Sequence, residues 1–195
     1  VDTAGLEEAA EGSLVWRMRR QTEAGIASAD LVLFVIDART RVRAADEHFG
    51  SLLRASGKRV ALVANKTESR AAEGGILESY SLGFGEPIEV SAEHGIGIAD
   101  VLDAVREAME TDEADGVDEP SEGEGQNAKP LNVAIIGQPN AGKSTLVNRL
   151  LGEERLLTSP EAGITRDAIA VDLTWNGRTF RLVDTADIRR KAKVV

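Results

Sequence analysis

A glycine-rich stretch at residues 137–145 carries the clearest chemistry in this chain. Its sequence, GQPNAGKST, matches the pattern G-x-x-x-x-G-K-[ST] and lies between an apolar run at 131–137 and a helix-like stretch at 143–151. Glycines let the backbone turn so that successive N–H groups point inward, and the N-terminus of the following helix attracts anions. A lysine at this position neutralises phosphate oxygens, and the next hydroxyl binds Mg²⁺. The pattern therefore predicts a phosphate loop that binds a nucleotide.

We expect every residue of this loop to contact the nucleotide, namely Gly137, Gln138, Pro139, Asn140, Ala141, Gly142, Lys143, Ser144 and Thr145. Two residues further along extend the site toward a metal ion. Thr165 lies in a turn-rich stretch before a strand, where its hydroxyl could reach Mg²⁺, although an ordinary loop threonine explains it equally well. Asp184 follows an apolar run and can hold the metal through water. Ser144, Thr165 and Asp184 are therefore the candidate Mg²⁺ ligands.

Two short polar motifs follow apolar runs in the first part of the chain and can recognise a base. Asn65-Lys66-Thr67-Glu68 comes after the run 59–64, and Ser91-Ala92-Glu93 comes after 87–90. A carboxylate at position 68 can accept from the N1–H and the 2-amino group of guanine, while an asparagine takes the other edge. Adenine lacks this pair of donors and would leave the carboxylate unpaired. The candidate base-binding residues, which favour guanine over adenine, are Asn65, Lys66, Glu68, Ser91 and Ala92.

These motifs need an alternating framework to bring them together. Apolar runs at 31–36, 59–64 and 87–90 have the pattern of strands buried on both faces. Helix-like stretches at 13–28, 44–56, 73–80 and 98–109 alternate with them. The second part adds two further runs, 168–175 and 178–184, joined by Asn176-Gly177, a dipeptide that favours a two-residue hairpin. The expected fold class is therefore α/β, with a mostly parallel sheet flanked by helices and one antiparallel pair.

Charge divides the chain of 195 residues into two parts. The whole chain carries −10, and residues 111–130, with seven acidic residues and one lysine, account for −6 of it. That segment has almost no large apolar side chain, so it is expected to be a flexible linker between 1–110 and 131–195, with an acidic interaction segment as the alternative. No apolar run is long enough to cross a bilayer, and the absence of cysteine fits a reducing compartment without proving one.

A repeat suggests that the two parts come from two copies of one domain. VDTAGL at 1–6 reappears as VDTADI at 183–188. The first copy adds two candidate nucleotide-binding residues, Asp2 and Gly5. The second copy adds Thr185, Ala186 and Asp187 beside Asp184.

Together these stretches resemble the Der (EngA) family of tandem-domain bacterial GTPases, within the Era/TrmE group. The resemblance rests on DTAGLEEA, MRRQTEAGI, LFVIDAR, NKTE with SAEHG, GQPNAGKSTLVNRLL, AGITRDAI and VDTADIRRKAK, which cover nearly all of the chain outside the linker. It implies a P-loop NTPase fold present as two partial GTPase domains. Residues 1–110 would be the C-terminal part of the first domain, and 131–195 the N-terminal part of the second.

The resemblance also implies a function, a GTP-hydrolysing molecular switch for biogenesis of the large ribosomal subunit. Its cofactors would be GTP or GDP, Mg²⁺ and K⁺, and its partner the 50S subunit or its rRNA, in the cytoplasm, with no membrane or DNA partner. Lys143, Asn140 and Thr165 would be the catalytic residues, with Asn140 binding a K⁺ that replaces an arginine finger. Asp187 stands where the family has glycine, so we expect weaker binding of GTP than of GDP there.

Two alternatives remain open from the sequence. The chain could be a non-catalytic piece that binds GDP at most and otherwise presents interaction surfaces. Its motifs also run in the order of circularly permuted GTPases, so the two parts could dock and form a single composite site. The repeated VDTA favours two separate halves, because a permuted domain needs only one copy.

Overall fold

The structure, a computed structural model, describes residues 22–115, 130–153, 156–158, 164–165, 168–169, 171–175 and 178–183. Six of the predicted nucleotide-binding residues lie outside these ranges, namely Asp2, Gly5, Asp184, Thr185, Ala186 and Asp187. The predicted helix 13–28 is described only over 22–28, which is helical.

Strands from both parts of the chain form one seven-stranded sheet, in the order β3-β2-β1-β4-β9-β8-β5. The first part supplies β1 (Leu31–Asp37), β2 (Arg59–Asn65) and β3 (Ile88–Val90). The second part supplies β4 (Leu131–Ile136), β5 (Leu156–Thr158), β8 (Val171–Trp175) and β9 (Arg178–Val183). The two sets meet where β1 pairs in parallel with β4, with Leu31 opposite Val133 and Phe34 opposite Ile136.

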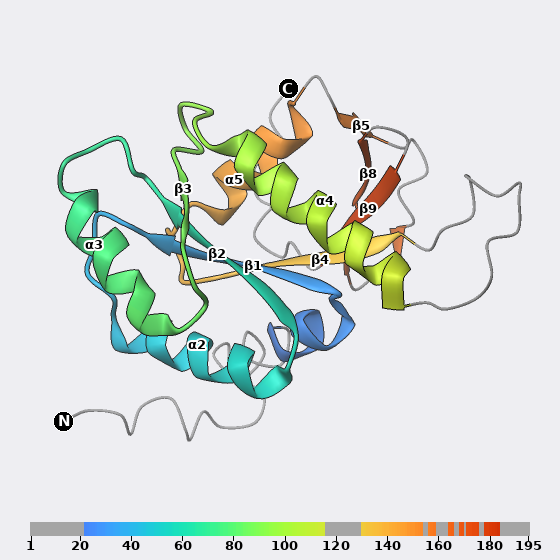
Figure 1. Ribbon diagram of the computed structural model, residues 1–195. Helices are drawn as coiled ribbons and strands as arrows, with labels where there is room; N and C mark the ends of the chain where they lie inside the picture. Colours follow the sequence, from blue (N-terminus) through green and yellow to red (C-terminus); the bar gives the residue numbers. More distant parts are fainter. Residues whose placement is uncertain are drawn as a thin grey trace, which may run out of the picture.

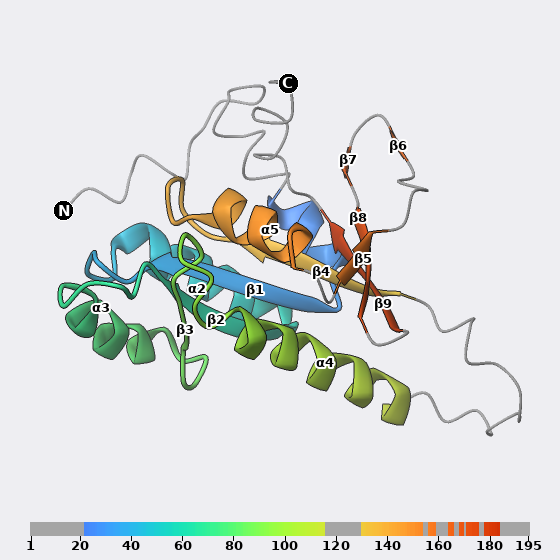
Figure 2. The ribbon, with the colours of Figure 1, turned by 90° about the horizontal axis from the view of Figure 1, so that it is seen from above.

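Helices cover both faces of this sheet (Figures 1 and 2). They are α2 (Ala44–Ser56), α3 (Ala72–Ser79), the short 3₁₀ helix η1 (Tyr80–Leu82), α4 (Ile98–Asp115) and α5 (Lys143–Leu151). Figure 1 shows α4 and α5 on one side and α2 and α3 on the other. This is the α/β arrangement expected for parallel strands joined by helical crossovers.

The side chains of β1 point alternately to the two faces of the sheet, and both faces are buried. Leu31, Leu33 and Val35 pack in the cluster beneath α4 and α5, whereas Val32 and Phe34 pack in the cluster on the α2 side. Successive side chains of a strand point to opposite faces, so a central strand must be apolar at every position.

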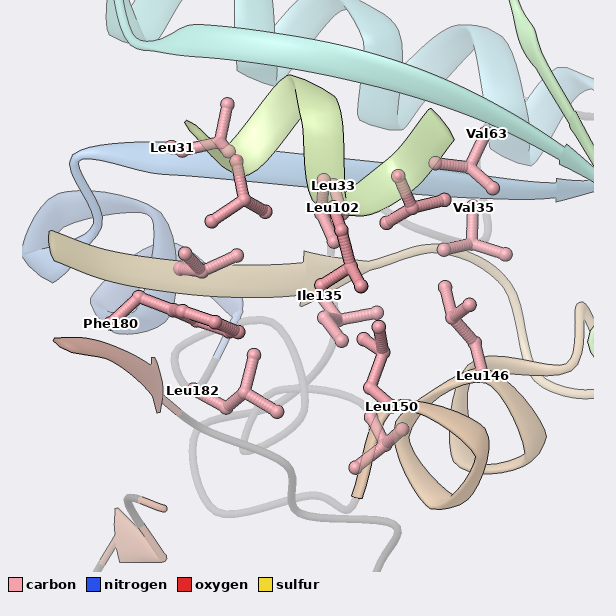
Figure 3. Packing of buried hydrophobic residues seen from close by; sticks show 14 of the residues in the cluster. Leu31, Leu33, Val35, Val63, Leu102, Ile135, Leu146, Leu150, Phe180 and Leu182 are labelled. Carbon is pink, nitrogen blue, oxygen red and sulfur yellow. The ribbon is translucent and has the colours of Figure 1, made fainter. Parts of the chain in front are cut away.

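The larger cluster joins both parts of the chain (Figure 3). Leu102 of α4 comes from the first part, and Leu146 and Leu150 of α5 come from the second. Phe180 and Leu182 of β9 complete the packing, and both are fully buried. One continuous core therefore lies across the junction between β1 and β4.

The predicted hairpin is confirmed by its pairing. β8 and β9 are antiparallel, and Trp175 pairs with Arg178, which leaves two residues for the connection. Asp172 and Arg181 face each other across the pair and form a two-pronged ion pair with N···O distances of 2.6 and 2.8 Å. The pKa of Asp172 is held below its usual value chiefly by the hydrogen bonds from this guanidinium.

Several elements differ from the sequence predictions. The sheet contains a second antiparallel pair, because the unpredicted strand β5 pairs with β8, and the helix predicted at 73–80 is α3 followed by η1. Helix α4 continues to Asp115, five residues into the segment predicted as a linker. Alanine and glutamate favour helix there, and the Thr111 hydroxyl bonds the Glu107 carbonyl. The run predicted as one strand over 168–175 is divided, because β7 (Ala168–Ile169) pairs with β6 (Ile164–Thr165) in a separate small sheet.

Candidate nucleotide-binding site

Four parallel strands end side by side at one edge of the sheet, and each is followed by residues of a predicted motif or by a charged group. In sheet order, β3 leads to Ser91, β2 ends at Asn65, β1 ends at Asp37, and β4 leads to Gly137. Ligands of open α/β sheets bind at the carboxyl ends of the strands. The fold therefore brings the predicted base-binding and phosphate-binding motifs to one edge of the sheet, although they come from different parts of the chain.

The phosphate loop turns on backbone conformations that require glycine. Gly137 has φ +154° and Gly142, which precedes α5, has φ +95°. A Cβ at Gly137 would lie 2.1 Å from the Val35 carbonyl oxygen of β1, and one at Gly142 would lie 2.1 Å from the Asn65 amide nitrogen. Because glycine has no side chain, the loop can pack closely against the first part of the chain. The helix that follows points the N–H groups of its first turn at the loop.

Lys143 begins α5 and reaches back over the loop. Its ammonium donates to the carbonyl oxygens of Gly137, at 2.9 Å, and of Gln138, at 2.8 Å. The ammonium therefore lies on the loop itself, where it can replace its hydrogen bonds to these carbonyl oxygens by hydrogen bonds to the more strongly charged oxygens of a phosphate.

Asn65 connects the phosphate loop to the predicted base-recognition loop, residues 91–96 after β3. Its side chain is buried, its amide nitrogen donates to the Ala141 carbonyl at 2.9 Å, and its amide oxygen accepts from the Ala92 N–H at 3.0 Å. Ala141 belongs to the second part of the chain and Ala92 to the first. The structure thus gives Asn65 a linking role that we did not predict, while its contact with the edge of a base stays a prediction.

Lys66 makes a second connection between the two parts. It has a positive φ of 70°, which is costly for a residue with a Cβ, and its ammonium donates to the Asn140 carbonyl at 2.5 Å. It also forms an ion pair with Asp37 at 2.6 Å. Burial alone would raise the pKa of the Asp37 carboxyl, but the hydrogen bonds from Arg39 and Lys66 outweigh burial and hold that pKa below its ordinary value of 3.8.

This pair predicts a loss of stability in acid. Because the pKa of Asp37 is lower in the folded chain, its contribution is present at neutral pH and disappears as the pH falls below about 4 and through the folded pKa. We expect Asp37→Asn to lower the free energy of unfolding by about 1 kcal/mol at pH 7 and by progressively less toward pH 3. Urea unfolding at a series of pH values measures the difference. Asp103→Asn, in the exposed pair with Arg106, is the control, and a pH-independent loss at Asp37 would contradict the prediction.

Glu68 and Ser91 lie beside this connection. The pKa of the exposed Glu68 carboxyl is lowered, first by the hydrogen bond from its own backbone N–H and then by the nearby Ser91 hydroxyl. That hydroxyl is buried, and among the described residues it has no partner of full hydrogen-bond geometry. The site therefore contains a stable carboxylate acceptor and a polar atom still able to form a hydrogen bond.

The remaining loop residues have different surroundings. Pro139, Asn140 and Thr145 are exposed, whereas Ala141 is buried. Of the three candidate Mg²⁺ ligands, Ser144 lies in the first turn of α5. Thr165 is placed by its backbone, which pairs with Ala168 in the small sheet, and Asp184 lies outside the described residues. A complete metal site therefore stays a prediction.

Two residues at this site were missed by sequence reasoning. Asp37 directly follows an apolar run, so its place at a strand end was available as a signal. Arg149, in the last turn of α5, donates to the carbonyl oxygens of Ala92 and Glu93. No local pattern pointed to it, because its partners are 56 and 57 residues away in the sequence.

The sheet carries a phosphate loop at the end of one parallel strand, and an asparagine and a lysine join that loop to a neighbouring strand end. This combination defines a P-loop nucleotide-binding protein. A family model described as a 50S ribosome-binding GTPase matches residues 1–66 and 132–194, and the chain belongs to this family. Within the described residues, no helix is both long and apolar enough to span a membrane.

Curated relatives agree with this assignment. The chain is 55% identical over 196 residues to the GTPase Der of Azorhizobium caulinodans and 54% identical over 198 residues to that of Nitrobacter hamburgensis. It is 52% identical over 212 residues to the GTPase Der of Rhizobium leguminosarum bv. trifolii. Each match covers 100% of this chain but only 43 to 45% of the relative. The chain therefore spans less than half the length of the curated relatives it matches.

Proposed function

We propose that this chain binds guanine nucleotides in one composite site built from both of its parts. The observation that carries the proposal is the Asn65 amide, which joins the Ala141 carbonyl of the phosphate loop to the Ala92 N–H of the base-recognition loop. A single buried side chain thereby sets the spacing between a phosphate site and a base site.

Different residues would bind the phosphates and the guanine base of the nucleotide. The loop N–H groups, the start of α5 and the Lys143 ammonium bind the phosphates. Glu68 accepts from the N1–H and 2-amino group of guanine, and the buried Ser91 hydroxyl and the Ala92 backbone lie at the same end. Adenine would leave the Glu68 carboxylate facing no donor, which gives the preference for guanine.

Mg²⁺ fits the start of α5, where the Ser144 hydroxyl follows the phosphate-binding lysine. When bound, this ion would neutralise charge on the phosphates. Thr165 and Asp184 are its further candidate ligands. K⁺ is a candidate beside Asn140, whose side chain is exposed while its carbonyl is held by Lys66.

For the longer protein, we propose GTP hydrolysis to GDP and phosphate, with Lys143, Asn140 and Thr165 as the catalytic residues. The names of the relatives support this reaction, and the description of the family model supports the 50S subunit as partner. The rRNA as the contact and the bacterial cytoplasm as the location are proposed from the sequence resemblance. Phosphate release from GTP by the chain itself tests the catalytic part. Binding without turnover would favour the non-catalytic alternative for this piece.

Nucleotide titration tests the composite site directly. We expect GDP to bind at least about 100-fold more tightly than ADP, since a mismatched base leaves a charged group unpaired. Calorimetric titration of the 195-residue chain with each nucleotide measures this ratio. Equal, weak binding of both would mean an isolated phosphate loop and would overturn the proposal.

A variant of Glu68 provides the matched control for this titration. Glu68→Gln keeps the size of the side chain but replaces one acceptor oxygen by a donor. It should weaken GDP binding but not ADP binding, because it removes the charged acceptor that adenine leaves unpaired. Glu73→Gln, on the exposed start of α3, should change neither.

A further inference from the structure

The guanidinium of Arg149 lies between the phosphate-loop helix and the base-recognition loop. Arg149 is in the last turn of α5, whose first residue is Lys143. Its Nη2 donates to the Glu93 carbonyl at 3.1 Å, and its Nε lies 3.3 Å from the Ala92 carbonyl. One helix of the second part therefore contacts the phosphate site at its beginning and the base-recognition loop of the first part at its end.

The loop that Arg149 contacts is closed by its own backbone hydrogen bonds. The Ser91 N–H donates to the Ile96 carbonyl at 3.0 Å, and the Ile96 N–H donates back to the Ser91 carbonyl at 3.1 Å. The His94 N–H also donates to Ser91, at 3.1 Å. Because residues 91–96 form one closed turn, a group that holds two of its carbonyls positions the whole turn.

Gly95 leaves the space that the guanidinium occupies. A Cβ at this position would lie 2.8 Å from Nη2 and 2.9 Å from Cζ of Arg149. The φ of Gly95 is +74°, so the turn itself also favours glycine. The loop backbone and the arginine thus fit together across the junction between the two parts of the chain.

We propose that Arg149 is a positioning residue for base recognition, which holds the turn 91–96 in register with the phosphate loop. The proposal rests on the composite guanine site proposed above. Ala92 is fixed from both sides, because its N–H bonds Asn65 and its carbonyl faces Arg149. Loss of Arg149 therefore lets the base end move while the phosphate end, with the Lys143 contacts, stays in place.

Selectivity for the base is the measurement that separates this role from a general effect on folding. Each of the two hydrogen bonds contributes about a factor of 3 to 10, so Arg149→Ala should weaken GDP binding about 10- to 100-fold and leave ADP binding unchanged. Arg149→Lys keeps the charge but cannot form both bonds in one plane, and it should recover only part of the loss. Arg106→Ala, which removes an exposed arginine from α4, is the control and should change neither nucleotide.

An equal loss for GDP and ADP, or no loss for either, would overturn the role of Arg149. If the unmodified chain itself fails to prefer GDP, the composite guanine site is wrong instead. Hydrogen exchange without nucleotide tests the positioning in either case. The amides of Ser91 and Ile96 should exchange about 10-fold faster in Arg149→Ala than in the unmodified chain, and unchanged exchange would contradict the proposal.

A double-mutant cycle with Gly95 adds a test that the arginine itself is the partner. Gly95→Ala should reduce the GDP preference because its methyl group displaces the guanidinium. In an Arg149→Ala background, the same methyl group should cost only its backbone strain. The two effects on GDP affinity should therefore be less than additive, and full additivity would show that they act separately.

Discussion

A single methyl group at position 142 is expected to remove most nucleotide binding from this chain. In Gly142→Ala, the new Cβ would lie 2.1 Å from the Asn65 amide nitrogen, at a backbone φ of +95°. Asn65 is short and buried, so it cannot move aside without losing its bonds to Ala141 and Ala92. We expect GDP affinity to fall at least about 100-fold, equivalent to roughly 2.8 kcal/mol. Calorimetric titration with GDP measures the change.

Gly57→Ala is the matched control for this variant. Gly57 also has a positive φ, +65°, at the end of α2, but no atom of the described residues would lie within 4 Å of a Cβ there. The substitution should cost about 1 kcal/mol of stability through backbone strain and leave GDP affinity unchanged. Retention of GDP binding in Gly142→Ala would mean that the loop and Asn65 are not in contact when nucleotide is bound.

The second large effect is expected at Asn65, on the stability of the whole chain. Asn65→Ala removes the amide and leaves the Ala141 carbonyl and the Ala92 N–H without their buried partner. Each of these two unsatisfied groups costs about 1–3 kcal/mol, so the free energy of unfolding should fall by roughly 2–6 kcal/mol. Because the core is continuous across both parts, urea unfolding should show one cooperative transition shifted to lower concentration.

Asn148→Ala provides the comparison, since Asn148 is exposed on α5. Its effect should stay within about 0.5 kcal/mol. If Asn65→Ala destabilises the chain no more than Asn148→Ala, the amide does not join the two parts. Two separate unfolding transitions in the unmodified chain would instead indicate that the parts fold as independent units.

Most elements of the fold could be predicted from local patterns. The helices 44–56 and 143–151 have the predicted bounds, and the strands of the parallel region differ from prediction by one residue at an end. These segments are periodic and bounded by loops, so their own residues determine their type. Helix α4 was predicted too short because its last turns carry acidic residues, which a composition argument assigned to a linker although they favour helix.

The partners of the strands were less predictable. The repeat of VDTA favoured two separate halves, whereas the structure pairs β1 with β4 across the acidic segment in one sheet. An apolar strand such as β1 shows that both its faces are buried but does not show which edge it offers to which neighbour. The sequence left this composite arrangement open as an alternative, and the limits 1–110, 111–130 and 131–195 remain predictions.

The phosphate loop was determined by the sequence alone, because its glycines, lysine and hydroxyl act within nine consecutive residues and need only a strand before them and a helix after them. The tertiary structure decided how that loop meets the base-recognition motif. The contacts that do this join residues between 27 and 76 positions apart. They are the two hydrogen bonds of Asn65, the bonds of Lys66 to Asp37 and Asn140, and those of Arg149 to the turn 91–96. Such contacts depend on which strand ends lie side by side, and that order is set by the packing of the whole sheet rather than by any local stretch of residues.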